Sequence, residues 1–521
     1  MGVMSAATLG WGADSSDTNA SDPLLDLFIK KGFVTQKEAE QVEAEAEAIR
    51  ANESQMPPVP LSRWKITQGI KSVQFFGDIR LRYEDREAQD PGGDKIDLQR
   101  FRYAVRVGLR GDLVDNLYYG FRVETSANPR SSFVTLGTAS APSSSNPAFQ
   151  GPFGKSTASL GVGQIYLGWR PWDWVDITLG KMPNPLYTTP MVWSGSLNPE
   201  GVAERFKYTI GEADFFATFG QFLYQDTNPT ETANGYFGLV NSTDLPFLLA
   251  WQGGVNYHIT KQVTLKVAPV LYQYTSFKNG QSPDMTPYSP DFSGTYVGQG
   301  AANGVSGIPA SYNLGGPFDG FYANQTGIND LLVLEFPVEL NIKLEKLNLR
   351  FFGDYAQNLE GASRARAAYN AIENSVYFSP GGQGALISHI SSPQTGDVRA
   401  YQVGFGIGST NLVYGPMEGL VYGSSSKKHA WEFRTYWQHI EQYALDVNLL
   451  DSDFFEGRAN LQGFYTAFAY SFTDAIIGTI RYGYANQIKY NLGTGGNNLD
   501  LPGLNPIKFY NLFQLDLTWR F

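Results

Sequence analysis

Hydrophobic and polar residues alternate with a period of two along most of the chain from Val73 onward. Between Phe509 and Phe521, apolar and mostly aromatic residues recur at every second position, and the positions between them are mostly polar. This period is that of an extended strand. About sixteen such stretches follow one another, each close to the roughly 9–11 residues that a tilted membrane strand needs. They lie near residues 73–84, 100–110, 117–126, 162–170, 174–182, 202–209, 214–224, 248–258, 263–274, 331–343, 347–357, 398–409, 429–441, 461–472, 475–485 and 507–521.

The connections between these stretches alternate in length. Short turns interleave with long segments rich in Gly, Ser, Pro and Asn, the pattern of short periplasmic turns and long outer loops in bacterial barrels. The sequence therefore predicts an all-β fold, a transmembrane antiparallel β-barrel of about 16 strands. Two weak segments, 174–182 and 202–209, leave fourteen or eighteen strands as alternatives, and the connection 410–428 is longer than this pattern predicts.

Composition narrows the class of protein. Charged residues make up 17% and hydrophobic residues 42% of the 521 positions, and no apolar run approaches the roughly 18 residues that a spanning helix needs. A net charge of -11 argues against nucleic acid as a partner. The chain has no cysteine, its four histidines show no metal-ligand spacing, and we expect neither a metal nor another cofactor.

The segment before the barrel predicts a different structure. We interpret residues 1–20 as disordered or as a signal remnant, because they lack a basic start and a long apolar core. Residues 21–55 predict a short helical hairpin, with a capping box at Thr35–Glu38. A proline-containing linker, 56–72, separates it from the barrel, 73–521. With an even strand count, both ends of the barrel lie on the short-turn side, so the hairpin is expected in the periplasm.

Arginines concentrate on one face of the first three strands. Lipid offers backbone groups no hydrogen-bond partner, so a spanning sheet must close, and a closed sheet of this size encloses a water-filled lumen. The charged face then lines that lumen. A basic stripe could raise the local concentration of anions, or it could be a charge network that only keeps the wall hydrated. The stripe consists of Arg80, Arg82, Arg100, Arg102, Arg106, Arg110 and Arg122.

The alternation breaks for about eighteen residues between the fifth and sixth strands, where four prolines preclude regular pairing. This is the third outer loop, which in general porins folds inward and narrows the channel. We expect the same here, against the alternative of an ordinary surface loop. The constriction residues predicted are Asn184, Pro185, Tyr187, Trp193, Asn198 and Glu200. In a later loop, Asp451 and Asp453 are interpreted as solvated rather than as part of a Ca²⁺ site.

The carboxy-terminal strand ends on an aromatic residue. Such an ending is similar to the terminal strand that outer-membrane barrels present to their assembly machinery, which is therefore expected as a partner. The predicted assembly signal is the apolar face formed by Phe513, Leu515, Leu517, Trp519 and Phe521.

Several short phrases carry a family resemblance. Gly180–Pro185 reads GKMPNP and Leu197–Ala203 reads LNPEGVA; Gly77–Glu84 reads GDIRLRYE, and Asp451–Phe454 reads DSDF. In this order they resemble the Gram-negative outer-membrane family called "putative porin". Lys30–Ala39, reading KKGFVTQKEA, resembles the amino-terminus of that family and of the phosphate-selective porins. The resemblance implies a diffusion channel embedded in outer-membrane lipid.

We therefore predict a porin, not an enzyme, that passes small hydrophilic solutes by diffusion and leans toward anions. Two alternatives stay open: an anion channel specific for phosphate, and a barrel sleeve that docks a periplasmic partner through the helical hairpin. An enzyme would need a serine paired with His439, and no Gly-x-Ser-x-Gly motif accompanies that histidine. A homotrimer is expected by analogy with sixteen-stranded porins.

Overall fold

The computed structural model describes residues 31, 69–90, 93, 95–126, 131–137, 159–224, 247–275, 330–373, 391–409, 419–423, 427–494, 501 and 507–521. Residues 1–67 and 68–521 form two separate units, and the second contains the barrel. Apart from Lys31, the predicted helical hairpin and most of the linker lie outside the described residues.

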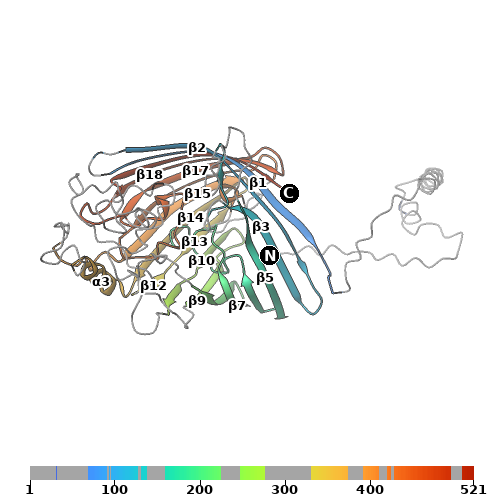
Figure 1. Ribbon diagram of the computed structural model, residues 1–521. Coiled ribbons are helices and arrows are strands. Elements are labelled where there is room, and N and C mark those ends of the chain that lie inside the picture. The colour runs from blue at the N-terminus through green and yellow to red at the C-terminus, as the bar shows by residue number, and fades with distance from the viewer. Residues whose placement is uncertain are drawn as a thin grey trace, which may run out of the picture. The chain divides into compact units, whose positions relative to one another are not determined.

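The second unit is a closed antiparallel sheet in which each strand of the wall pairs with its neighbours in sequence (Figure 1). Closure is made by β1 and β19, which pair over twelve positions from Asp78–Arg520 to Gln89–Phe509. The strands are β1 (Gln74–Gln89), β2 (Lys95–Asp112), β3 (Leu117–Ser126), β4 (Val134–Thr135), β5 (Ser159–Trp172), β6 (Val175–Lys181), β7 (Glu200–Ile210), β8 (Ala213–Leu223), β9 (Phe247–His258), β10 (Val263–Val267), β11 (Val270–Tyr274), β12 (Leu332–Glu335), β13 (Val338–Lys343), β14 (Leu347–Asn358), β15 (Arg399–Ser409), β16 (Trp431–Ile440), β17 (Leu461–Ser471), β18 (Ile476–Gln487) and β19 (Phe509–Arg520).

These nineteen segments form sixteen wall strands. The two-residue β4 is a loop segment laid against β2. β10 and β11 are halves of one strand, and so are β12 and β13, because Pro269 and Pro337 cannot donate to the ladder. The two breaks adjoin, and Ala268 N donates to Pro337 O at 3.1 Å across them. The predicted sixteen-stranded barrel is confirmed, and all sixteen predicted segments correspond to wall strands.

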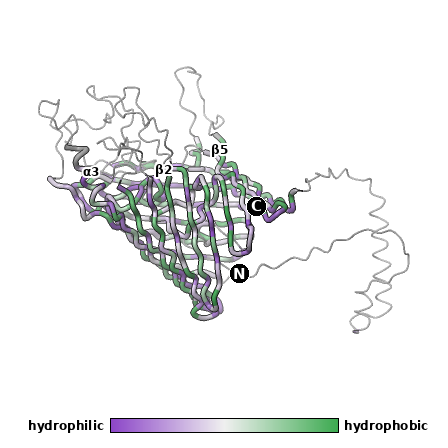
Figure 2. The backbone as a smooth tube through the Cα atoms, turned by 90° about the horizontal axis from the view of Figure 1, so that it is seen from below, coloured by the Kyte–Doolittle hydropathy of each residue, from purple (hydrophilic) through white to green (hydrophobic). Residues whose placement is uncertain are grey.

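The two faces of the wall differ as the alternation predicts. Hydrophobic and hydrophilic residues alternate along the strands in Figure 2. Leu81 and Phe101 point outward and are 51% and 62% exposed, whereas Arg82 points inward and is 3% exposed. An outward apolar band suits contact with lipid, and the inward polar face lines the interior.

Helices are few in the described part of the chain. They are α3 (Gly361–Glu373), between β14 and β15, and the short 3-10 segments η3 (Leu420–Tyr422) and η4 (Phe455–Gly457). No helix among the described residues has both the length and the apolar character to cross a bilayer.

The carboxy-terminal residue sits at the seam of the barrel. Phe521 N donates to Gly77 O at 3.1 Å, and Gly77 N donates to Phe521 O at 3.0 Å. The ring of Phe521 stacks on that of Phe75, with 5.5 Å between centroids, and it lies where a side chain on residue 77 would be. Four residues of the predicted assembly signal, from Phe513 to Trp519, lie on the outward face of β19, and Phe521 follows that strand and is also exposed. That the barrel assembly machinery binds these residues stays a prediction.

Gly77→Ala should weaken the seam. The added Cβ would lie 2.4 Å from the Arg106 carbonyl oxygen and 2.6 Å from the Phe521 ring, so one of them must move. Overpacking of this kind costs about 1–3 kcal/mol. We expect a lower midpoint for the heat-induced gel shift of the folded barrel. Gly253→Ala on β9 is the control, because its Cβ would meet no atom within 4 Å; equal midpoints for the two variants would contradict this account.

Candidate channel interior

Loop 182–199, between β6 and β7, crosses the interior and docks on the far wall. Tyr187 donates its hydroxyl to Glu339 at 2.5 Å, Thr188 donates to Glu335 at 2.6 Å, and Thr189 donates to Asp354. These carboxylates alternate with outward residues of β12 to β14, so they face the interior. Short hydrogen bonds between hydroxyls and carboxylates are strong ones, and they hold the loop inside the barrel.

The Gln252 side chain also holds loop 182–199 on the wall, through the backbone of Tyr187. Gln252 on β9 accepts from Tyr187 N and donates to Tyr187 O, both at 2.8 Å, and it also donates to Ala268 O at 3.1 Å. The Lys266 ammonium lies 3.7 Å from the centre of the Tyr187 ring. Burial and the nearby Glu339 carboxylate raise the pKa of Tyr187 well above its ordinary value, so the hydroxyl stays a donor.

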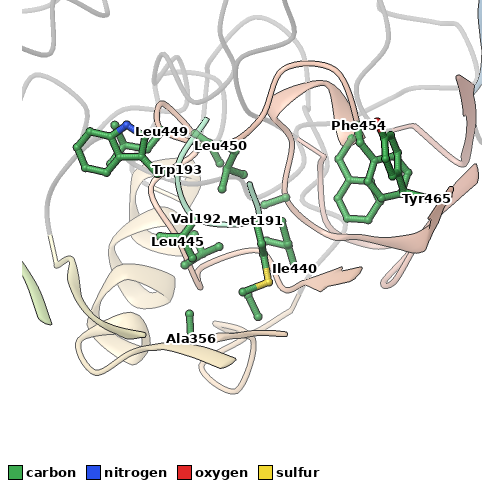
Figure 3. Packing of buried hydrophobic residues seen from close by; sticks show 14 of the residues in the cluster. Met191, Val192, Trp193, Ala356, Ile440, Leu445, Leu449, Leu450, Phe454 and Tyr465 are labelled. Atoms are coloured by element: carbon green, nitrogen blue, oxygen red, sulfur yellow. The ribbon is translucent and has the colours of Figure 1, made fainter. Parts of the chain in front are cut away.

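A second loop, 441–460 between β16 and β17, meets loop 182–199 inside the barrel. Ser194 N donates to Leu449 O at 2.6 Å, and Asp451 N donates to Pro190 O at 3.3 Å. Around these bonds the two loops share one apolar cluster (Figure 3). Its members include Met191, Val192, Trp193, Ile440, Leu445, Leu449 and Leu450. The sequence of loop 182–199 explains why the cluster lies inside the barrel. The loop is rich in proline and contains apolar and aromatic residues, which are buried here instead of facing water.

The long-loop half of the arginine stripe is paired with carboxylates. Arg82 holds Asp516 through two bonds of 2.7 and 2.9 Å and also reaches Asp453 at 3.0 Å. Glu84 accepts from Arg100 at 2.5 Å and lies 3.1 Å from Arg86 Nε and 3.5 Å from Arg102. Phe133 places its ring 4.0 Å from the Arg82 guanidinium. Near β4, this part of the stripe is therefore a packed ion network.

Asp453 belongs to loop 441–460 and ties it to β1. Burial opposes ionisation of Asp453, but the guanidiniums of Arg82 and Arg86 outweigh burial and hold the pKa of this carboxyl below its ordinary value. The interpretation of Asp453 as solvated is wrong, because its carboxylate bonds both arginines. The sequence analysis also missed Arg86 and Asp516, although both lie in phase with the stripe on their strands.

The short-turn half of the stripe keeps more of its positive charge. Arg80 and Arg106 share Asp78 at 2.7 Å each, and Arg122 lies 3.4 Å from Glu124. Arg110 donates through Nε to Gln74 at 2.9 Å. Within the described part of the chain, neither Arg110 nor Arg520 has a carboxylate at ion-pair distance. Arginines therefore exceed carboxylates on this part of the wall.

Residues 419–423, a described part of the long connection between β15 and β16, lie inside the barrel near its short-turn end. Val421 N donates to Glu432 at 3.0 Å, Arg481 donates to Val421 O at 2.8 Å, and the Arg434 guanidinium lies 4.7 Å from the Tyr422 ring. Leu420 and Val421 are buried. This inward turn explains the connection's excess length.

A cavity of about 400 Å³ remains on the opposite side, against β2, β3, β5, β6 and β7. Its lining combines the wall residues Arg110, Tyr118, Tyr166, Arg170 and Arg205 with Met182–Pro185 at the root of loop 182–199. Among the described residues, the two inward loops occupy the side of β9 to β19, so this cavity marks the side of the interior that the described residues fill less.

Part of the chain matches a known protein family. Residues 93–302 match the family model described as "Putative porin". The predicted porin resemblance is confirmed over these residues, which include β2 to β11 and loop 182–199. The match and the closed barrel support a porin-type channel in an outer membrane.

Solved outer-membrane structures are similar to this chain at low identity. OmpT, an in-vitro folded outer membrane protein of Vibrio cholerae, aligns with 87% of this chain and 100% of its own, at 10% identity and a TM-score of 0.35. Its trimer form aligns with 86% and 99%, at 11% identity and 0.36. A structure titled "Asymmetric conductivity of engineered proteins" aligns with 86% and 100%, at 8% and 0.34. No curated protein matches the chain.

The predicted constriction residues do not lie together at one place in the barrel interior. Asn184 and Pro185 line the cavity, and Tyr187 and Trp193 hold the loop on the far wall and in the apolar cluster. Asn198 accepts from Gln164 on β5 at 2.9 Å. Glu200 does not belong to the loop: it begins β7, where it pairs with Lys181 at 2.6 Å on the outward face. Its placement in the constriction was therefore wrong.

His439 has polar neighbours at the long-loop end of β16. Its Nδ1 lies 3.1 Å from Gln462 Oε1, and its ring stacks on Tyr401 with 4.8 Å between centroids. Among the described residues, no group of three His, Asp or Glu side chains could hold a metal ion.

Releasing the inward turn at η3 should widen the path. Replacing Leu420 and Val421 together by Ser removes the apolar burial that holds this turn, at a cost of about 2–5 kcal/mol for a buried Leu truncation. We expect a larger single-channel conductance in planar bilayers with an unchanged heat-modifiable barrel. Val114→Ser, in an exposed short turn, is the matched control. An unchanged conductance in a folded double variant would show that the turn does not limit flow.

Loop 441–460 should loosen as the pH rises. Burial and the charge of Asp453 raise the pKa of Asp451 to about 7. The folded pKa thus lies above the unfolded value, so this group's contribution to loop stability falls as pH rises from about 4 toward 7, by at most about 1.4 kcal/mol per unit. The protection factors of the amides of residues 451–457, which correct exchange rates for their intrinsic pH dependence, should fall over that range, and Asp451→Asn should flatten this profile. A profile unchanged by Asp451→Asn would assign the effect to another group.

Proposed function

We propose that the protein is an outer-membrane porin that passes small hydrophilic solutes by passive diffusion, with a preference for anions. The observation that carries this is the excess of arginine over carboxylate on the short-turn half of the wall formed by β1, β2 and β19, around Arg110 and Arg520. Fixed charge on a channel wall raises the local concentration of the opposite ion. A net chain charge of -11 does not oppose this, because selectivity depends on the residues that line the path.

The arrangement of the loops supports a narrow path. Loops 182–199 and 441–460 occupy the side of β9 to β19, and the η3 turn occupies part of the short-turn end. The remaining route follows β1 to β3 and β5 to β7, past the cavity. We assign the short-turn end, with the helical hairpin, to the periplasm, by the usual direction of such barrels. The short-turn half of the stripe, from Arg80 and Arg106 to Arg110 and Arg122, forms one wall of this route.

The assembly context belongs to the same proposal. The outward apolar band contacts outer-membrane lipid, the carboxy-terminal face from Phe513 to Phe521 is read by the barrel assembly machinery, and the protein forms a homotrimer. Sedimentation of the detergent-solubilised protein tests the last point, and a monomer mass would contradict it.

A second function is favoured by one observation, the filling of the interior from both ends. A barrel closed by its own loops could serve as a sleeve that docks a periplasmic partner. Single-channel recording separates the two functions: stepwise openings support the porin, and a folded barrel without current supports the sleeve. Equal currents in chloride and phosphate would argue against a phosphate-specific channel.

Neutralising the unpaired arginines should reduce anion selectivity. Arg110→Gln with Arg520→Gln removes two charges that no described carboxylate balances, whereas Arg102 is already close to Glu84. We expect the reversal potential under a KCl gradient to shift toward the cation side, with a several-fold lower ratio of chloride to potassium permeability. Arg399→Gln, exposed at the long-loop end of β15, is the control. An unchanged ratio in the double variant would overturn the proposed anion preference.

A further inference from the structure

The cavity under the root of loop 182–199 has a basic wall. Arg110, Arg170 and Arg205 all line it. Arg205 and Arg170 share Asp176, at 2.8 and 3.4 Å, and Arg170 also lies 3.8 Å from Asp112. Arg110 donates through Nε to Gln74, and its two Nη groups have no acceptor in the described part of the chain. The lining therefore carries uncompensated positive charge.

Two further donors at this cavity have no acceptor. Asn184 Oδ1 accepts from Leu186 N at 3.0 Å, but Asn184 Nδ2 is buried and bonds no group in the described ranges. Arg205 Nε is likewise buried without an acceptor among the described residues. Buried donors are ordinarily satisfied, and leaving one unpaired costs free energy. Both side chains line the cavity, and these two donor atoms are enclosed by protein beside it.

The floor of the cavity is aromatic. Tyr118 and Tyr166 lie opposite Gly168 and Gly120 on the paired strands β3 and β5. A Cβ at either glycine would come within 2.5 Å of the opposite tyrosine ring, so the rings lie over the bare backbone of the wall. Their centroids are 6.3 Å apart, and the Arg170 guanidinium stands 4.1 Å over the Tyr118 ring.

The roof of the cavity is largely apolar. It is formed by Met182, Pro183 and Pro185, with the Asn184 amide among them. A volume of about 400 Å³ lies within the range of small-molecule sites and exceeds what a simple inorganic ion needs. An inorganic anion would leave the roof and floor without contacts, and a neutral sugar would leave the guanidiniums without a counter-charge.

We infer that this cavity is a binding site for a small organic carboxylate with a planar, apolar body. The carboxylate pairs with the Arg110 guanidinium, because a planar guanidinium fork matches a carboxylate. The body lies between the tyrosine floor and the proline roof. The site rests on the proposed function in one respect: the solute reaches it through the channel. It adds a solute class to that function.

Binding of benzoate to the full-length protein in detergent tests this inference. Fluorine NMR of 4-fluorobenzoate, with unlabelled competitors, gives relative affinities without requiring current. We expect benzoate to compete at least about tenfold better than acetate, inorganic phosphate or benzyl alcohol. Equal competition by acetate or phosphate would show a general anion site and overturn the inference. Equal competition by benzyl alcohol would show that the carboxylate does not contribute to binding and would overturn it as well.

Variants identify the site. Arg110→Gln and Asn184→Leu should each weaken benzoate binding about tenfold or more, and Tyr166→Leu should bring benzoate closer to acetate. Arg399→Gln, outside the cavity, should bind as the parent does. Unchanged binding in all three cavity variants would place the ligand elsewhere.

Current recording on the same preparations keeps the two proposals separate. Normal openings that benzoate does not affect, with no benzoate binding, would overturn the inference and leave the porin in place. Benzoate binding to a barrel that carries no current would leave the site in place and overturn the porin function.

Discussion

Closure of the backbone ladder between β1 and β19 is the constraint on which the rest depends. A sheet in lipid cannot leave an edge unpaired, because hydrocarbon offers no partner for the exposed N–H and C=O groups. Twelve residue pairs satisfy that edge here, and the bonds between Gly77 and Phe521 continue them to the last residue. Once the sheet is closed, every second side chain points into an enclosed interior, and polar residues at those positions have other protein groups to pair with.

The interior is then organised by a few charged wall residues that accept contacts from loops. On one side, Glu335, Glu339 and Asp354 accept hydrogen bonds from hydroxyls of loop 182–199. On the other side, Arg82 and Arg86 form ion pairs with Asp453 of loop 441–460. The apolar cluster around Met191 forms where the two loops meet. In the part of the chain that the structure describes, polar anchors at the wall and apolar packing at the centre thus leave the side of β2 to β7 less occupied.

The sequence predicted the wall well, because strand identity follows from a local, repeated signal. A strand in lipid must present apolar residues on alternate positions, so each of the sixteen could be recognised in isolation. Even the prolines at 269 and 337 did not hide their strands, since the alternation continues on both sides of each break. The porin resemblance rested on short sequence phrases. Two of them, Gly180–Pro185 and Leu197–Ala203, lie within residues 93–302, which the family model matches.

The interior was harder to predict, because it depends on contacts between distant segments. Nothing near Asp453 in sequence reveals that its partners are Arg82 and Arg86, and Glu200 looked like a loop residue until its pairing with Lys181 placed it on β7. The length of the connection between β15 and β16 was a usable signal. It is longer than the other short-turn connections, and residues that a tight turn does not need can bind inside the barrel, as Val421 does to the inward carboxylate of Glu432.

The ion network at Arg82 also bears on the order in which the molecule forms. Its bonds to Asp453 and Asp516 join residues 371 and 434 positions apart. Contacts of such separation cannot form until the first and last strands meet, and loop-closure entropy makes them late events. Before that moment Glu84 and Arg86 stand on an open, hydrated sheet. The Arg82–Asp516 part of the network therefore forms when the wall closes, and Asp453 fixes loop 441–460 to β1.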